Sequence, residues 1–254
     1  MNNRASIFMG ALFVRRLMSY KRILFKISGE ALEDKDNHRS YDAKFIETIS
    51  KVVKEITALG TEVAIVVGGG NIWRGSLAPS IGIDKTTGDY MGMLATIMNG
   101  MALQATFEKN GLDTRVMSAL PINACGEPFI LRKAIRHLEK GRVIIFVAGV
   151  GSPFFTTDTA AALRAKEIKA DAILMGKNGV EGVYDDDPKL NKNAKLYKEL
   201  TYHEILAKNL KVMDATAVGL LADSNIQTKV FNMSNPFNAV RVVDGEEVGT
   251  TIKA

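Results

Sequence analysis

The segment that most constrains the fold is an apolar run that ends in three consecutive glycines. Residues 63–67 are aliphatic without alternation, as expected of a strand buried on both faces of a parallel sheet. Gly68, Gly69 and Gly70 then permit a sharp turn and a close approach of backbone N–H groups to a bound group. Arg74 adds a permanently charged fork suited to phosphate. The segment predicts a phosphate site at the end of a central strand, although a tight strand-to-helix turn explains the glycines equally well.

Apolar strands and helical patterns alternate along the rest of the chain. Strands are predicted at residues 23–27, 116–120, 143–148, 172–175 and 228–233. Helices are predicted at residues 42–59, 88–109, 127–140, 158–169 and 214–223. Pro236 and Gly245 indicate a terminal hairpin. The alternation predicts an α/β fold in three layers, an αβα sandwich with helices on both faces of a mostly parallel central sheet.

Composition excludes several classes of protein. The chain is 46% hydrophobic and 24% charged, and no apolar stretch reaches the roughly 20 residues that span a bilayer. A single cysteine, Cys125, cannot form an intramolecular disulfide, which favours a cytoplasmic location. Of the net charge of +5, Arg4, Arg15 and Arg16 carry three, which leaves about +2 for residues 18–254. We therefore predict neither a membrane protein nor a nucleic-acid-binding protein.

The first 17 residues contain no acid and hold an apolar stretch between arginines. A secretory signal or a transit peptide fits this pattern, but the apolar stretch is short and no cleavage motif follows it. Met18 leads directly into the first predicted strand. We therefore predict that residues 1–17 form a disordered extension and that residues 18–254 form a single domain.

Familiar nucleotide and metal motifs are absent. The chain has no Walker A sequence, no Gly-x-Gly-x-x-Gly fingerprint and no His-Arg-Asp loop. The three histidines, His38, His137 and His203, show no metal-ligand spacing. We therefore predict no metal site built from side chains.

Three other segments carry polar residues at strand ends. Lys26 closes the first strand, where it either reaches the surface or meets an anion such as a transferring phosphate. Residues 149–158 combine glycines, hydroxyls and a helix start that favours an anion, although Asp158 also suits a helix N-cap. Residues 178–188 form an acidic stretch that, taken alone, indicates a surface turn.

Together these segments resemble the amino acid kinase family, and within it the branch of bacterial uridylate (UMP) kinases. The resemblance covers nearly all of the chain from Tyr20 onward. Its motifs are KISGEAL at 26–32, GGGN at 68–71 with RG at 74–75, GDYMGMLAT at 88–96, PFFTTD at 153–158 with AA at 160–161, and VFNM at 230–233. The segments at 88–96 and 153–158 are specific to the UMP branch, whereas the lysine and glycine segments are shared with kinases of acetylglutamate, aspartate and carbamate.

The resemblance implies transfer of the γ-phosphate of ATP to the α-phosphate of UMP, with Mg²⁺ bound through the phosphates. Lys26, Asp158 and Arg74 would be catalytic. The ATP-binding residues would be Lys26, Ile27, Ser28, Gly29, Gly70, Asn178, Tyr184 and Asp187. The UMP-binding residues would be Gly69, Arg74, Asp89, Val150, Gly151, Ser152, Pro153, Phe154, Phe155, Thr156 and Thr157. The resemblance also implies a homohexamer, feedback inhibition by UTP and a place in pyrimidine nucleotide biosynthesis.

Two positions depart from the pattern of the branch. Val150 stands where many members have threonine, so one hydroxyl is missing from the predicted base pocket. Residues 33–39 are acidic and lack the glycine of a loop associated with activation by GTP, so we predict a weak or absent response to GTP.

Two alternative functions remain open. Another kinase of the same fold would use a carboxylate or carbamate acceptor, which the negative charge of Asp89 disfavours. A non-catalytic nucleotide sensor would need phosphate affinity but no transfer geometry, and Lys26, Arg74 and Asp158 disfavour it.

Overall fold

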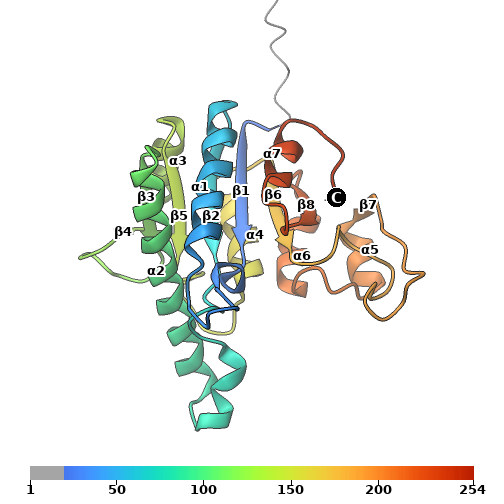
Figure 1. Cartoon of the computed structure of the whole chain (residues 1–254), viewed down its shortest axis with the longest axis horizontal. Helices are drawn as coiled ribbons and strands as arrows, with labels where there is room; N and C mark the ends of the chain where they lie inside the picture. Colours follow the sequence, from blue (N-terminus) through green and yellow to red (C-terminus); the bar gives the residue numbers. More distant parts are fainter. Residues whose placement is uncertain (1–19) are drawn as a thin grey trace, which may run out of the picture.

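The computed structural model describes residues 20–254, so the predicted extension at 1–17 lies outside the described residues (Figure 1). The strands are β1 (Arg22–Ile27), β2 (Glu62–Val67), β3 (Thr114–Ser118), β4 (Glu127–Pro128), β5 (Val143–Val147), β6 (Ala172–Lys177), β7 (Glu199–Thr201), β8 (Gln227–Asn232) and β9 (Thr250–Lys253). The α-helices are α1 (Ala43–Ala58), α2 (Lys85–Lys109), α3 (Leu131–Glu139), α4 (Thr157–Glu167), α5 (Tyr202–Ala207), α6 (Ala215–Ala222) and α7 (Asn238–Val243). Three 3₁₀ helices are η1 (Gly29–Leu32), η2 (Gly75–Leu77) and η3 (Pro79–Ile81).

The described strands form one sheet in the order β4-β3-β5-β2-β1-β6-β8-β9-β7. Every neighbouring pair is parallel except β8 and β9. β1 and β2 are central strands, and β1 pairs with β2 on one side and β6 on the other. The carboxyl ends of β1, β2, β5 and β6 therefore lie along the same edge of the sheet, where open α/β sheets place their ligands.

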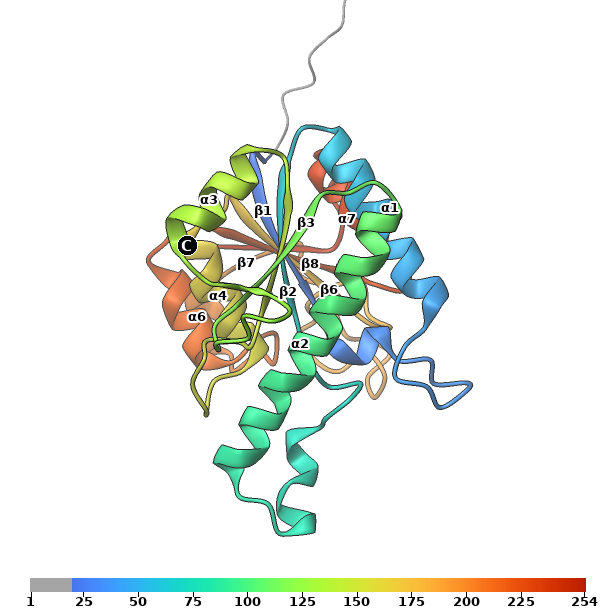
Figure 2. The same cartoon turned by 90° about the vertical axis from the view of Figure 1, so that its left-hand side faces the viewer.

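Helices cover both faces of this sheet, which confirms the predicted three layers. Alternation along β1 divides its side chains, because Ile23 and Phe25 join one core cluster and Leu24 joins the other. The first cluster contains residues of α1, α2 and α7, and the second contains residues of α3, α4, α5 and α6. Figure 2 shows α1, α2 and α7 on one side of the fanned strands and α3, α4 and α6 on the other.

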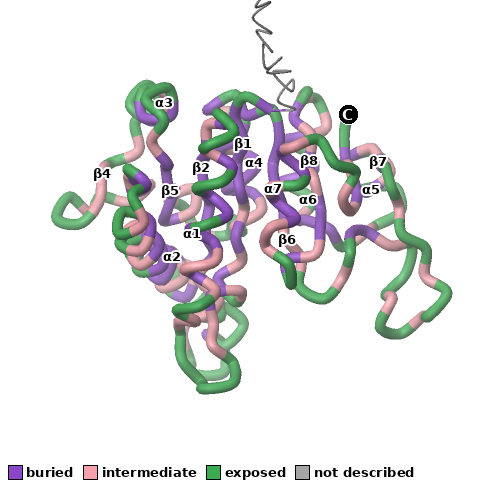
Figure 3. Tube along the Cα trace, turned by 45° about the horizontal axis from the view of Figure 1, so that its top comes forward, coloured by how far each residue is buried: buried purple, intermediate pink, exposed green. Residues whose placement is uncertain are grey.

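Burial is deepest in the central strands, as the purple segments of Figure 3 show. All five residues of β5 are buried, and β2 is buried from its second residue onward. The loops beyond the strand ends are more exposed (Figure 3). Within residues 20–254, none of the helices has the length and apolar character needed to cross a bilayer.

Two predicted elements are wrong. The pattern at 127–140 predicts one helix, but Glu127 and Pro128 form the short edge strand β4 and α3 begins only at Leu131. The C-terminal segment is not a hairpin either. Residues 238–243 form α7 between β8 and β9, and this helix packs against α1. In both places tertiary pairing decides the local structure, which a local pattern does not report.

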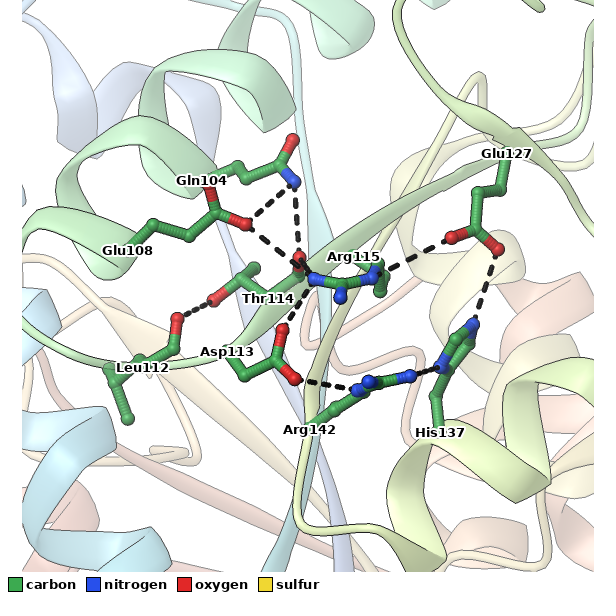
Figure 4. A network of polar contacts seen from close by, with 9 residues as sticks. All are labelled: Gln104, Glu108, Leu112, Asp113, Thr114, Arg115, Glu127, His137 and Arg142. Carbon is green, nitrogen blue, oxygen red and sulfur yellow. Dashed lines mark hydrogen bonds and ion pairs between the residues drawn. The ribbon is translucent and has the colours of Figure 1, made fainter.

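A network of charged side chains connects the elements at the β4 edge of the sheet (Figure 4). We call Asp113, Arg115, Glu127, His137 and Arg142 the edge network. Asp113 Oδ2 accepts from Arg142 Nε at 2.6 Å, and Asp113 Oδ1 lies 2.5 Å from Arg115 Nη1. Since Arg142 can only donate, it donates to His137 Nδ1 at 3.1 Å, and His137 Nε2 then donates to Glu127 at 3.2 Å. The edge network ties β3, β4, α3 and the residue before β5 together.

Candidate active site

The turns after β1 and β2 touch one another at the carboxyl edge of the sheet. The Gly68 N–H donates to the Ile27 carbonyl at 2.9 Å. A Cβ on Gly29 would lie 2.5 Å from the Gly70 nitrogen and 2.7 Å from the Gly68 oxygen. No residue other than glycine fits at position 29 without moving the backbone. This contact explains the glycines that the sequence places at both strand ends.

A largely buried ion pair lies where these turns meet α4. Lys26 Nζ is 3.0 Å from Asp158 Oδ1, and the two side chains are 12% and 19% exposed. The pair lacks hydrogen-bond geometry, so Asp158 Oδ1 is a buried oxygen without a hydrogen-bond partner among residues 20–254. Lys26 is therefore close to Asp158 but not directed at it. The arrangement leaves room for both groups to bind a ligand.

Thr156 sets the start of α4 and hence the position of Asp158. The Thr156 hydroxyl oxygen accepts from the Asp158 N–H at 3.0 Å and the Thr159 N–H at 3.3 Å, which makes Thr156 the N-cap. The alternative role of Asp158 as the N-cap is thus wrong. The hydroxyls of Thr156 and Thr159 both donate to the Asp214 carboxylate, which is itself the N-cap of α6. Burial by itself raises the pKa of Asp214, but these hydrogen bonds outweigh it and hold the pKa below its usual range.

A cavity of about 310 Å³, here called the glycine-turn cavity, lies on one side of this junction. Of the predicted UMP-binding residues, it is lined by Gly69, Asp89, Val150, Ser152, Phe154, Phe155, Thr156 and Thr157. Gly70, which the resemblance assigns to ATP, lines this cavity as well. Gly151 and Pro153 belong to the same loop but do not line the cavity.

Asp89 is already engaged at the wall of the glycine-turn cavity. Its Oδ2 accepts from the Phe154 N–H at 2.8 Å and lies 3.2 Å from Lys85 Nζ. Lys85 Nζ also lies 5.6 Å from the centre of the Phe154 ring. Phe154 has a φ of +71°, a strained backbone conformation for a residue other than glycine, and its side chain is 66% exposed. The residue that donates to Asp89 is therefore strained. Sequence reasoning missed Lys85, which comes only four residues before Asp89.

Arg74 does not line the glycine-turn cavity. Its side chain is half exposed, and its Nη2 donates to Glu33 Oε2 at 3.2 Å while its Nε lies 3.8 Å from Glu30 Oε1. The guanidinium is thus held by two acidic residues of the turn after β1.

Two further cavities are lined by residues at and beyond the ends of β1 and β6. A cavity of about 260 Å³, the lysine cavity, is lined by Lys26, Ile27, Ser28 and Asn178 among the predicted residues. A cavity of about 540 Å³, the loop cavity, is lined by Tyr184 and Asp187. The structure therefore divides the predicted ATP-binding residues, apart from Gly29 and Gly70, between two neighbouring cavities.

Lys177 lies among these groups and was missed by sequence reasoning. It is the last residue of β6 and donates from Nζ to the Val212 carbonyl at 2.6 Å. Burial lowers the pKa of Lys177, and the neighbouring charge of Lys26 lowers it further, whereas Asp158 opposes the shift. Lys26, Asp158 and Lys177, here called the strand-end cluster, thus carry one more positive than negative charge. The Gly176-Lys177 pair was the only signal in the sequence.

The residues present fit a magnesium ion that is held largely by a ligand's own oxygens. Asp158 Oδ1 is a buried carboxylate oxygen that no hydrogen bond from residues 20–254 reaches, and Mg²⁺ prefers carboxylate oxygens as ligands. No group of three or more His, Cys, Asp or Glu side chains suited to a metal occurs within residues 20–254. One carboxylate together with phosphate oxygens is a common way to bind Mg²⁺.

Comparisons with known proteins identify the family of this chain. The model of the amino acid kinase family matches residues 21–232. The crystal structure of UMP kinase from Bacillus anthracis is 44% identical, with a TM-score of 0.89 over 92% of this chain and 96% of that one. UMP kinase from Ureaplasma parvum is 42% identical, with a TM-score of 0.88 over 93% and 100% of the two chains. Uridylate kinase from Archaeoglobus fulgidus is 29% identical, with a TM-score of 0.68 over 91% and 99%. The chain belongs to the amino acid kinase family.

Proposed function

We propose that this protein is a UMP kinase that transfers the γ-phosphoryl group of ATP to the α-phosphate of UMP. The bond between the γ-phosphorus and the β–γ bridging oxygen breaks, and a UMP phosphate oxygen forms the new bond, giving UDP and ADP. The attacking oxygen is already an anion, so no general base is required. The work of the protein is to align two polyanions and to neutralise charge in the transition state.

The observation that carries this proposal is the position of the Lys26–Asp158 pair between the cavities. Lys26 lines the lysine cavity, and Asp158 directly follows Thr157, which lines the glycine-turn cavity. A donor in the lysine and loop cavities and an acceptor in the glycine-turn cavity would therefore meet at Lys26. The similarity to UMP kinases at 42% and 44% identity supports UMP as the acceptor.

The positions of individual residues support the following roles. Lys26 would bind the transferring phosphoryl group, and Asp158 would orient Lys26 and hold Mg²⁺ together with the phosphate oxygens. Bound Mg²⁺ would supply positive charge to the β- and γ-phosphate oxygens. Asp89 would exchange Lys85 and the Phe154 N–H for the ribose hydroxyls of UMP. Arg74 would turn from Glu30 and Glu33 to the UMP phosphate.

Assembly into a homohexamer is also part of the proposal. Tyr90, Leu94, Met98 and Met101 are exposed on α2 at spacings of three and four residues, so they form one apolar stripe. Such a stripe supports contact with another copy of the chain. We further place the enzyme in pyrimidine nucleotide synthesis in the cytoplasm, as one domain at 18–254. We expect inhibition by UTP and little activation by GTP.

An assay of ADP release with Mg-ATP tests this function. UMP, CMP, acetylglutamate and carbamate are offered separately as acceptors, with Lys26→Ala as the inactive variant. Lys21→Ala is a matched control, because Lys21 is an exposed lysine just before the same strand. Turnover with UMP that is lost only in Lys26→Ala is the expected result. Turnover with a carboxylate acceptor would overturn the substrate, and UMP binding without any turnover would favour a nucleotide sensor.

A further inference from the structure

The placement of Lys177 follows from the register of two central strands. Lys26 of β1 pairs with Met175 of β6, and Lys177 lies two residues further along β6. Leu24 and Met175 both pack into the core cluster that contains α4 and α6. Because side chains alternate along a strand, Lys26 and Lys177 point to that same face. Two lysines from neighbouring strands therefore converge on the start of α4.

The charge of Lys177 is poorly matched by its surroundings. Its ammonium group is half-buried, and within residues 20–254 it makes no ion pair. Its hydrogen-bond partner, the Val212 carbonyl, is neutral, and the charged groups that influence it are Lys26 and Asp158. A cation withdrawn from water beside another cation is costly unless an anion joins them. An anionic ligand would balance the positive charges of Lys26 and Lys177.

The cavities show where such an anion would lie. Among residues 20–254, Lys177 is the one residue that lines both the lysine cavity and the loop cavity. The loop cavity is lined by Tyr184, Leu210 and Val212 and can hold a base. The lysine cavity contains Lys26 and is lined by the polar residues that follow β1 and β6. A ligand whose base occupies the first cavity and whose phosphates reach Lys26 must pass Lys177.

We propose that Lys177 binds the β-phosphate of the nucleoside triphosphate donor. This role rests on the kinase function proposed above. Lys26 would then hold the γ-phosphoryl group, while Lys177, oriented by the Val212 carbonyl, meets the phosphate behind it. When the bond to the γ-phosphorus breaks, its electron pair stays on the β-phosphate of ADP. A cation at that phosphate stabilises the negative charge that develops on it and so favours departure of ADP.

The test compares the binding of ADP and AMP to the full-length protein by isothermal titration. The two ligands differ only in the β-phosphate, so Lys177→Met should weaken ADP binding about ten- to a hundred-fold and leave AMP binding unchanged. Lys177→Arg keeps the charge and should recover part of the ADP affinity. In turnover, Lys177→Met should raise the KM for ATP and lower kcat, with the KM for UMP unchanged.

Lys229→Met is the matched control. Lys229 is also a partly buried strand lysine whose pKa is lowered first by burial, and its Nζ donates to the neutral Thr251 hydroxyl at 2.7 Å. It lines neither the lysine cavity nor the loop cavity. Its replacement should leave the affinities for ADP and AMP unchanged, which separates a local role of Lys177 from a general effect of removing a buried lysine.

Two outcomes would overturn the role of Lys177. One is an equal loss of ADP and AMP affinity in a folded Lys177→Met variant, and the other is no loss of either. If Lys177→Met does not fold, Lys177→Gln keeps a donor for the Val212 carbonyl without the charge, and the same comparison decides. Because ADP and AMP binding needs no acceptor, the result stands even if UMP is not phosphorylated. A failure of the kinase function is therefore distinguishable from a failure of this role.

Discussion

The strand-end cluster and the edge network contain the same kinds of charged groups but satisfy them differently. In the edge network each charge meets opposite or neutral partners: Arg115 lies near Asp113 and Glu127, and Arg142 donates to Asp113 and His137. In the strand-end cluster, Asp158 pairs with Lys26 but not with Lys177, and Asp158 Oδ1 lacks a hydrogen bond among the described residues. In a structural network the charged groups are paired with one another. In a binding site, some charged and polar groups have no protein partner and gain one when a ligand binds.

Position in the sheet accounts for the difference. The strand-end cluster lies where β1 and β6 end and the parallel sheet opens to ligands. Most of the edge network comes from α3 and from residues around β3 and β4, at the far edge of the sheet. Apart from the buried His137, its side chains are between 26% and 50% exposed, so water screens their charges and each pair contributes little by itself. Substitutions in the two clusters should therefore affect different properties.

Removal of Lys26 should have the largest effect. Lys26→Ala is expected to lower kcat about 10²- to 10³-fold, because the transferring phosphoryl group loses its cation. The melting temperature should change little, since Asp158 then lies beside Lys177 and remains partly compensated. Steady-state kinetics and calorimetry on the same preparation check both quantities. A large fall in melting temperature with near-normal turnover would assign Lys26 to the structure instead.

Asp89→Ala should have an intermediate effect that is confined to the acceptor. Asp89 holds the Phe154 N–H and faces the glycine-turn cavity, where the ribose of UMP is expected. The KM for UMP should rise about tenfold, because charge-assisted hydrogen bonds are lost, with the KM for ATP unchanged. Wild-type and variant enzymes are compared with UMP and dUMP as acceptors.

If Asp89 contacts the ribose hydroxyls, its removal should reduce the preference for UMP over dUMP. Equal losses for the two acceptors would instead show that Asp89 acts through the loop that carries Phe154. Turnover of ATP without acceptor serves as the background in each series.

Arg142→Met should have the smallest effect, on stability alone. It removes the partner of Asp113 and His137, so we expect a loss of about 1 kcal/mol and a fall in melting temperature of about 2–4 °C. Arg136→Met removes the same charge from an exposed position of α3 and serves as the control. Turnover with UMP should be unchanged in both variants. A loss of activity in Arg142→Met would contradict the assignment of the edge network to structure.

The effect of Arg142→Met on stability should also depend on pH in the acid range. The hydrogen bond from Arg142, followed by the charges of Arg115 and Arg142, holds the pKa of Asp113 below its usual range. Burial alone would raise the pKa of Glu127, but hydrogen bonds from Lys133 and His137 lower it overall. Both carboxylates thus stabilise the fold above their unfolded pKa of about 4, and this stabilisation is lost as the pH falls through the lower folded values. The difference between wild type and Arg142→Met should therefore shrink from pH 6 to pH 3.

Local patterns predicted the layered fold and the strand ends that form the site. Lys26 lies near the end of β1, the three glycines follow β2, and Thr156 and Thr157 stand at the start of α4 in the segment after β5, so the sequence places them at one edge. Lys177 escaped notice because its partner Val212 is 35 residues away and acts through its carbonyl. The contacts of Arg74 with Glu30 and Glu33 escaped for the same reason, since they depend on tertiary contacts between two turns.

The short elements β4, β7 and α7 were also not predicted from the sequence. β4 has two residues and β7 has three, too few for a periodic signal. α7 has six residues, and its first turn follows Phe237 rather than a capping side chain. Their existence depends on pairing and packing with distant strands and helices.

The most direct test of the central claim is ³¹P NMR of the protein mixed with Mg-ATP and UMP. The expected result is one UDP formed for each ADP, with both signals lost in Lys26→Ala and retained in Arg142→Met. ADP without UDP, or no product despite bound UMP, would contradict phosphoryl transfer to UMP at the strand-end cluster.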